Sequence, residues 1–352
     1  MNAWRGLVGL FAVAILGIGE RQTLGQDLKP VEFVKPAPNT ADEPLAKDFS
    51  LARTAAFLDA GSLWWTREKK CGTCHTNFPY LMARPLLKEM PLAGHDEVRR
   101  FFENRIAHWD DDAKQAKPLT DTEVVATACV LAFNDAQTTG KLHPLTRRAL
   151  DKMWTLQQKG GAWDWAKCRW PPFEHDDYFG AVFAAVGVGS APEDYAKSAS
   201  AKEGLARLKV YLRRTSAPNL HHKAWLMWAS VKLDGLMTRE EREQTIAELL
   251  ALQQHDGGWS LPSLGYWQGN DPKHGIDTNA ASDGYGTGLV VYALRQAALP
   301  AVHPAIQKGV NWLRANQRES GRWFVRSLNT DKFHYITNAG TSFAVLALKA
   351  CE

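Results

Sequence analysis

The chain has 352 residues and a formal net charge of +4, from 42 Lys and Arg against 38 Asp and Glu. Hydrophobic residues make up 45% and charged residues 23%, a balance that excludes a largely disordered chain. The weak positive charge includes no basic run, so nucleic acid is not expected as a partner. The 14 Trp, roughly three times average usage, predict repeated packing sites or an aromatic-lined cavity.

Residues 1–25 have the pattern of a signal peptide. Arg5 gives a short basic start, residues 7–18 are apolar, and residues 23–25 offer small side chains at a cleavage site. The apolar stretch is short for a membrane span, so no integral membrane segment is expected after cleavage; an uncleaved anchor is the alternative. Residues 26–48, rich in Pro and charge, predict a flexible leader. We therefore expect a periplasmic or secreted protein.

The first predicted helical hairpin pairs residues 51–63 with residues 77–90, and Cys71-Gly72-Thr73-Cys74-His75 lies between them. Two thiols three residues apart can form thioethers to the vinyl groups of haem, and the adjacent His then ligates the iron. Export agrees with this motif, because c-type haem is attached outside the cytoplasm. The sequence predicts haem c on Cys71, Cys74 and His75.

Other interpretations of this motif stay open. A Cys71–Cys74 disulfide with a bystander His, or a metal site, would use the same residues. The Pro residues in the following helix leave the sixth iron ligand undecided, with three candidates: Met82, Met90 and His95. The sequence also leaves open whether Cys168 pairs with Cys351 in an oxidising compartment.

Three later segments share one pattern, in which a helix ends in Gln and a Gly-containing turn leads to a Trp. They cover residues 148–163, 249–259 and 308–323. Gly adopts the backbone conformation that ends a helix, and Trp can pack on the helix end beneath it. A second, more apolar helix follows each Trp, over about residues 176–189, 283–298 and 338–349.

Two more pairs, over residues 95–108 with 121–134 and 201–214 with 220–233, complete the pattern. Each pair has an amphipathic first helix and a second helix that is apolar nearly all round, as an interior helix would be. The sequence therefore predicts an all-α fold, a single (α/α)6 toroid of six helical hairpins over residues 49–352. An open superhelix of helix pairs is the alternative.

The three Gln…Gly-x-Trp segments resemble the QW motif of the squalene/hopene cyclase superfamily, whose α/α toroid is shared with protein prenyltransferases. Residues 308–323 fit that motif at every position, residues 249–259 fit it in part, and residues 148–163 are degenerate. The resemblance covers residues 140–352 and, more weakly, residues 49–139. It implies the toroid fold and an apolar cavity for an isoprenoid-like ligand, while chemistry must be argued from the site.

In triterpene cyclases, which carry two helical barrels, the catalytic acid lies in a D-x-D-D-T-A segment that begins an inner helix. This chain has length for one barrel, and its nearest counterpart, residues 174–179, departs from the family segment at the first and last two positions. The resemblance places Asp176 at the proton donor. Such an acid must stay protonated, and we expect Glu174 and Asp177 to raise its pKa. Alternatively, Asp176 is a helix cap and Asp177 a first-turn charge.

In a closed toroid the inner helices run the same way, so their first residues line one mouth. We therefore expect the following acids and histidines to lie at that mouth: His75, Asp176, Asp177, His175, His221, His222 and Asp283. A cation is disfavoured at a helix N-terminus, so these histidines predict ligands of haem iron or another metal, with solvated loop histidines as the alternative. Aromatic residues of the inner helices are expected to line the well below.

Three functions follow from these patterns. The first is an exported haem protein in electron transfer, with a redox partner and an apolar, isoprenoid-like small molecule in the cavity. The second is a single-barrel terpene cyclase or isomerase that uses Asp176 as general acid, with Glu174, Asp177 and Asp283 as supporting carboxylates. The third is a non-catalytic toroid that binds a lipid, glycan or protein.

Overall fold

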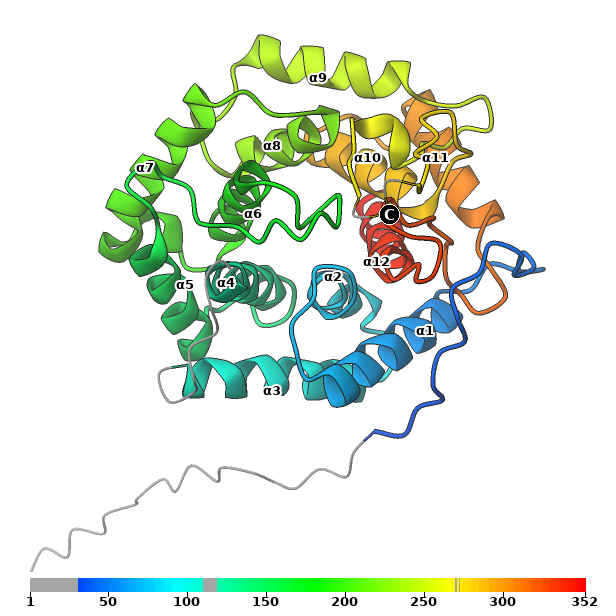
Figure 1. Cartoon of the computed structure of the whole chain (residues 1–352), viewed down its shortest axis with the longest axis horizontal. Helices are drawn as coiled ribbons and strands as arrows, with labels where there is room; N and C mark the ends of the chain where they lie inside the picture. The colour runs from blue at the N-terminus through cyan, green and yellow to red at the C-terminus, as the bar shows by residue number, and fades with distance from the viewer. Residues whose placement is uncertain (1–30, 110–118, 270, 272) are drawn as a thin grey trace, which may run out of the picture. The chain divides into compact units, whose positions relative to one another are not determined.

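Helices alternate along the chain between the outer and the inner layer of a ring (Figure 1). The computed structural model describes residues 31–109, 119–269, 271 and 273–352, so the expected signal peptide lies outside it. The outer helices are α1 (Leu51–Trp64), α3 (Ala93–His108), α5 (Pro144–Leu156), α7 (Ala199–Arg214), α9 (Arg239–Ala251) and α11 (Pro304–Ala315). The inner helices are α2 (Asn77–Ala83), α4 (Leu119–Gln137), α6 (Asp177–Ser190), α8 (Leu220–Lys232), α10 (Gly284–Gln296) and α12 (Ile336–Ala350).

The inner layer closes on itself. Each inner helix packs against the next one along the chain, and α12 packs against α2 (Figure 1). An open superhelix lacks this last contact. The described residues contain no strand, only isolated bridges between Leu45 and Arg318 and between Trp170 and Glu174. The all-α class is therefore confirmed for the part of the chain that the structure describes. None of the helices described there is both long and apolar enough to cross a bilayer.

Short polar side chains start three of the inner helices. Asp176 accepts a hydrogen bond from Phe179 N at 2.8 Å, Asn219 from His222 N at 3.1 Å, and Asp283 from Gly286 N at 2.8 Å. These caps satisfy backbone donors that have no partner inside the helix. They set the residue at which each inner helix begins.

The expected helix over residues 77–90 is shorter than predicted. The α-helical part of α2 ends at Ala83 and continues as a 3-10 helix over Arg84–Leu87. Pro85 lacks the backbone N–H of an α-helix, and its ring displaces the preceding turn. The helix therefore tightens at this point.

The three repeated Trp residues lie fully buried between the layers. Each indole donates a hydrogen bond to the carbonyl ten residues earlier: Trp163 to Met153 O at 2.8 Å, Trp259 to Leu249 O at 2.7 Å, and Trp323 to Leu313 O at 2.7 Å. Each Trp thus satisfies a free carbonyl near the end of its outer helix and fills the space behind it. The repeated sequence produces a repeated contact.

The three repeated Gln residues join neighbouring hairpins. Each side-chain amide donates to the carbonyl of its own turn Gly and to a carbonyl at the next outer helix. The second acceptors are Gly204 O at 3.0 Å for Gln157, Ala305 O at 2.9 Å for Gln253, and Ser50 O at 2.9 Å for Gln317. The turn glycine has φ of 93° at Gly321, where a Cβ would also lie 2.3 Å from the Arg53 carbonyl carbon. Only Gly fits there.

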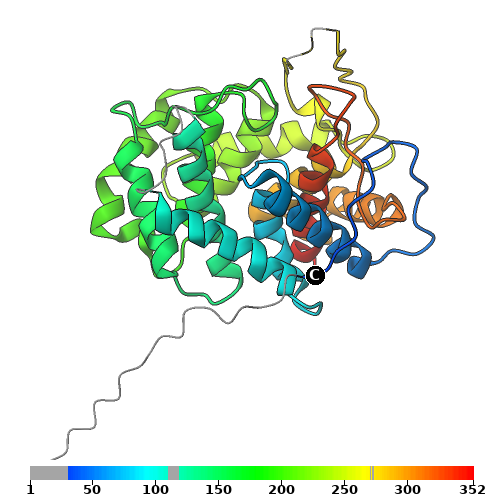
Figure 2. The same ribbon diagram turned by 60° about the horizontal axis from the view of Figure 1, so that its bottom comes forward.

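Residues 35–46, within the expected flexible leader, are packed against the ring. Figure 2 shows this dark blue segment passing close to α11. Buried Arg322 forms an ion pair with Glu43 and donates to Asn39 Oδ1 at 2.9 Å. Ala46 N donates to Gln317 O at 2.8 Å. This part of the chain therefore differs from a free linker, because a buried Arg needs these acceptors.

We predict that the amide of Gln317 stabilises ring closure. Gln317 is 1% exposed, accepts from Ser50 N at 2.7 Å and donates to Thr54 Oγ1 at 2.8 Å. Gln317→Ala leaves these buried groups without partners, so it should lower the free energy of unfolding by about 2–4 kcal/mol. Urea unfolding followed by circular dichroism measures this change.

Exposed Gln307 on α11 is the matched control, and Gln307→Ala should change the unfolding free energy by less than about 0.5 kcal/mol. Equal effects of the two substitutions would contradict the role given to Gln317.

Candidate functional site

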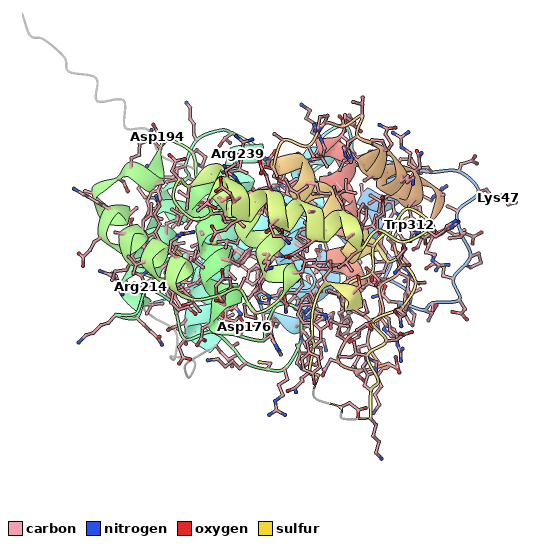
Figure 3. All side chains as sticks on the ribbon, turned by 90° about the horizontal axis from the view of Figure 1, so that it is seen from above. Lys47, Asp176, Asp194, Arg214, Arg239 and Trp312 are labelled. Carbon is pink, nitrogen blue, oxygen red and sulfur yellow. The ribbon has the colours of Figure 1, made fainter. Side chains whose placement is uncertain are left out.

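The first turns of the inner helices bring the predicted site residues to one end of the ring. Asp176 and Asp194 flank α6, and Figure 3 places them at opposite ends of the ring. Contacts between α6, α8 and α10 at the Asp176 end join side chains that are far apart in the sequence. This is the mouth at which the sequence predicts the acids and histidines to meet.

Asp176 and His222 form an ion pair at this mouth, with Oδ2 of Asp176 3.1 Å from Nε2 of His222. The other ring nitrogen, Nδ1, lies 2.5 Å from Asn219 Oδ1. Both ring nitrogens therefore lie close to side-chain oxygens, one of Asp176 and one of Asn219. The role of Asn219 was missed in the sequence, although an Asn directly before a predicted helix is a cap signal.

The pairing with His222 keeps Asp176 ionised. Burial, the largest single effect, raises the pKa of Asp176, but His222, the backbone N–H of Phe179 and His175 together lower it by more, and the net shift is downward. We expected Glu174 and Asp177 to raise this pKa and hold the acid protonated. The structure differs, because His222 lies 3.1 Å from the carboxylate, and the groups that shift its pKa include neither Glu174 nor Asp177.

His221 and Tyr285 form a second, fully buried pair. His221 Nε2 lies 2.8 Å from the Tyr285 hydroxyl, and both side chains are 0% exposed. Burial, then repulsion by His222 and His175, lowers the pKa of His221 well below its usual value, so this ring is neutral. The indole of Trp267, itself 4% exposed, covers the histidines, with ring centroids 5.4 Å from His221 and 6.3 Å from His175.

The predicted shared metal site is not formed by the histidines. His75 lies against Trp170 and Phe173, away from the pairs made by His221 and His222. Among the described residues, no three His, Cys, Asp or Glu side chains are placed to hold a metal ion.

The carboxylates of Asp283 and Asp177 accept hydrogen bonds from the backbone and are not placed to react. Asp283 accepts from Tyr285 N, Gly286 N and Leu261 N. Burial raises its pKa to about 6, against the lowering effect of these hydrogen bonds. Asp177 accepts from Trp165 N at 3.1 Å and pairs with Lys167 at 2.7 Å. Both anchor the chain two residues beyond a repeated Trp. We therefore assign them positioning roles.

The Cys71–His75 segment forms a turn that leads directly into α2. Asn77 fixes this turn, because its Oδ1 accepts from Thr73 N at 2.9 Å and its Nδ2 donates to Cys71 O at 3.0 Å. Cys71 and Cys74 are free thiols, so the structure has no Cys71–Cys74 disulfide. Burial and then nearby Glu174 raise the pKa of Cys74 well above its usual value, so this thiol is protonated.

Glu174 lies between two thiols. Burial, and after it the charge of Glu174, also raises the pKa of Cys168, to about 11. Cys168 therefore lies near Cys74 at the mouth, and Cys351, at the C-terminal end of α12, is a free thiol too. Glu174 contacts these thiols, a role different from the predicted support of Asp176.

The Cys71–His75 turn carries the donor types that haem c uses, two thiols and an imidazole, but side chains fill the space beside His75 and leave no room for a macrocycle in this conformation. The ring of His75 is 94% removed from solvent and makes no hydrogen bond with the described residues, while Trp170 and Phe173 pack edge-on at 5.8 and 5.5 Å. Burial lowers the pKa of His75, which keeps the ring neutral, as an iron ligand must be. Residues 168–175, which belong to no helix, occupy the space over this ring.

The central well is filled by its own side chains. A cavity of about 20 Å³ remains, with room for about one water molecule. Its walls are apolar apart from the thiol: Cys74, Phe78, Pro79, Met82, Phe173, Phe179, Phe183, Trp225 and Phe343. The cavity expected for an isoprenoid-like ligand is therefore closed, because aromatic rings from the inner helices and from Phe173 meet at the centre.

Of the three sixth-ligand candidates, only Met82 shares a cavity wall with Cys74. Both ring nitrogens of His95 have partners: Nε2 lies 2.8 Å from Asn134 Nδ2, and Nδ1 lies 3.1 Å from Asp96 Oδ1. Met90 lies beyond the 3-10 helix that follows α2.

Comparison with known proteins assigns no family. No protein-family model matches the chain, and no curated protein matches it. A solved structure described as a polysaccharide lyase is similar, with 12% sequence identity and a TM-score of 0.49 over 85% of this chain and 96% of that chain.

We predict that Asp176→Asn lowers the free energy of unfolding by about 1–3 kcal/mol at pH 7, because the Phe179 N–H and the buried ring of His222 lose an ionised acceptor. The folded-state pKa of Asp176 is lower than its unfolded value of about 3.9. The carboxylate therefore contributes stability above that value and loses it as the pH falls through the folded-state pKa. The difference in unfolding free energy between wild type and variant should decrease below about pH 4. Urea unfolding at pH 7 and at lower pH measures the gap.

Asp194, whose side chain is 74% exposed, is the control, and Asp194→Asn should shift the unfolding free energy by less than about 0.5 kcal/mol. A gap for Asp176→Asn that widens in acid would show that the carboxyl group is protonated in the folded protein.

Proposed function

We propose that the protein is an exported haem c protein that transfers electrons. Cys71 and Cys74 would hold the haem through thioethers, and His75 would be its axial ligand. The observation that supports this most is the donor set: two free thiols and one neutral imidazole without a hydrogen bond on a single turn. The proposed location, periplasmic or secreted, rests on the signal-peptide pattern of residues 1–25.

The chain's own residues prepare this turn. Asn77 bonds to the backbone on both sides of the motif and holds Cys71 and Cys74 at the start of α2. Burial keeps His75 neutral without engaging its nitrogens. When bound, the haem iron supplies a one-electron redox centre, and its partner is a separate redox protein or small molecule.

Haem loading requires the loop over residues 168–175 to move. Phe173 and Trp170 contact the ring of His75, and the cavity beside Cys74 has room for about one water molecule. The loop is tied by backbone hydrogen bonds between Trp170 and Glu174 and by side-chain packing. Because residues 168–175 belong to no helix, this loop can shift without breaking one.

The ring itself is proposed to be a single (α/α)6 toroid of the squalene/hopene cyclase type. The three repeated Gln, Gly and Trp contacts and the closure of α12 on α2 support this proposal. A cyclase or isomerase reaction with Asp176 as general acid finds less support, because this carboxyl group is ionised beside His222.

We predict covalent haem on protein made together with haem-attachment machinery. The intact mass should exceed that of the mature chain by about 0.6 kDa, and the pyridine haemochrome spectrum should be that of haem c. Cys71→Ala with Cys74→Ala should abolish the added mass. His75→Ala should keep attached haem but alter the iron spectrum, because the axial ligand is lost.

Cys168→Ala and Cys351→Ala are matched controls that should leave both mass and spectrum unchanged. An unmodified mass in the wild-type protein, or equal haem loss in the Cys168 variant, would rule out the proposed attachment.

A further inference from the structure

A second cavity, open to solvent, lies outside the central well. It has a volume of about 690 Å³, within the range of small-molecule sites. Residues 35–41 form one wall, the end of α1 a second, and residues 331–335 before α12, together with Asn338 in its first turn, a third. Of the Cys71–His75 turn and its neighbours, only Thr76 touches this cavity.

Aromatic rings form the apolar part of the walls. Phe333 and Tyr335 stack with centroids 5.5 Å apart and planes 1° apart. Trp65 meets Tyr335 edge-on at 5.1 Å, and Trp64 lies beside it. Flat rings at fixed angles provide stacking surfaces for another flat ring.

Two lysines give the wall of the pocket a positive charge. Lys35 and Lys332 are exposed and have no carboxylate partner among the described residues. The one carboxylate in the wall, Asp331, is already paired with Arg326 at 2.9 Å. Beside the pocket, Trp65 Nε1 and Thr76 Oγ1 are buried and lack a hydrogen-bond partner in the described part of the chain. This arrangement suits a ligand that carries oxygen acceptors.

The wall over residues 35–41 is held in place from the far end of the chain. Asn39 Nδ2 donates to His334 O at 3.0 Å, and buried Arg322 donates to Asn39 Oδ1 at 2.9 Å and Ala37 O at 3.3 Å. These bonds span the pocket and join two of its walls. The site is therefore built in advance, which lowers the ordering cost of binding.

We propose that this pocket binds a flat aromatic molecule with carbonyl or phenolate oxygens, of the quinone class. Stacking rings alone would also accept a neutral sugar, which gains less from the two lysine charges than a ligand with negative oxygens does. The two lysines favour a ligand with negative or partly negative oxygen atoms. The proposal does not depend on haem, since Cys71, Cys74 and His75 do not line the pocket.

The test is titration calorimetry of the mature chain, leader included, with anthraquinone-2-sulfonate. Anthracene-2-sulfonate, which lacks the carbonyl oxygens, is the matched probe. We expect the quinone to bind, with the anthracene analogue at least about tenfold weaker. Lys35→Ala combined with Lys332→Ala should weaken quinone binding by about tenfold, and these exposed positions leave folding intact.

Trp65→Phe keeps a ring but removes the indole N–H, and it should weaken the quinone several-fold without changing the anthracene analogue. The control variants are Lys202→Ala and Tyr266→Ala, both at exposed positions outside the pocket, and they should bind as wild type. Equal affinity for the two probes would overturn the proposed ligand class, as would binding of cellotetraose that depends on Trp65. Absence of quinone binding would overturn it as well.

Discussion

The ring depends on one repeated interaction, in which a glutamine amide at the end of an outer helix bonds to the next outer helix. Gln157 and Gln253 join successive hairpins, and Gln317 joins the last outer helix to the residue that caps the first. The final contact converts a row of hairpins into a closed ring. It needs a glycine in each turn, because the neighbouring helix backbone lies where a side chain would be.

Closure determines what can meet at the mouth. Because the inner helices start at the same end, their caps and first turns form a polar layer above an aromatic core. Within this layer polar groups lie in pairs, Asp176 beside His222 and His221 beside Tyr285. Buried atoms without a hydrogen-bond partner remain there among the described residues, such as Nδ1 of His221, and the ring of His75 packs between Trp170 and Phe173. A buried polar group left without a partner is unfavourable, and a bound group that uses it would relieve this.

Local pattern predicted the helices and turns well. The starts of α6, α8 and α10 follow from Asp176, Asn219 and Asp283, and the break in α2 follows from Pro85, because these signals act within a few residues. The state of the site depends on contacts between distant segments. Asp176 is ionised because His222 comes from another helix, and the well is closed because Phe173 enters it from a loop. The local sequence gives no signal for either contact. It gives none for the packing of Glu43 on Arg322.

We propose that the Cys71–His75 turn holds a redox group beneath the loop over residues 168–175. Hydrogen exchange with mass spectrometry tests this directly, on protein loaded with haem and on the Cys71→Ala, Cys74→Ala double variant without it. We expect faster exchange of the loop amides in the loaded protein, because Trp170 and Phe173 leave the ring of His75. Exchange in α10 and α12 should not change. Identical loop exchange in the two proteins would contradict the claim, since it would place any haem elsewhere on the chain.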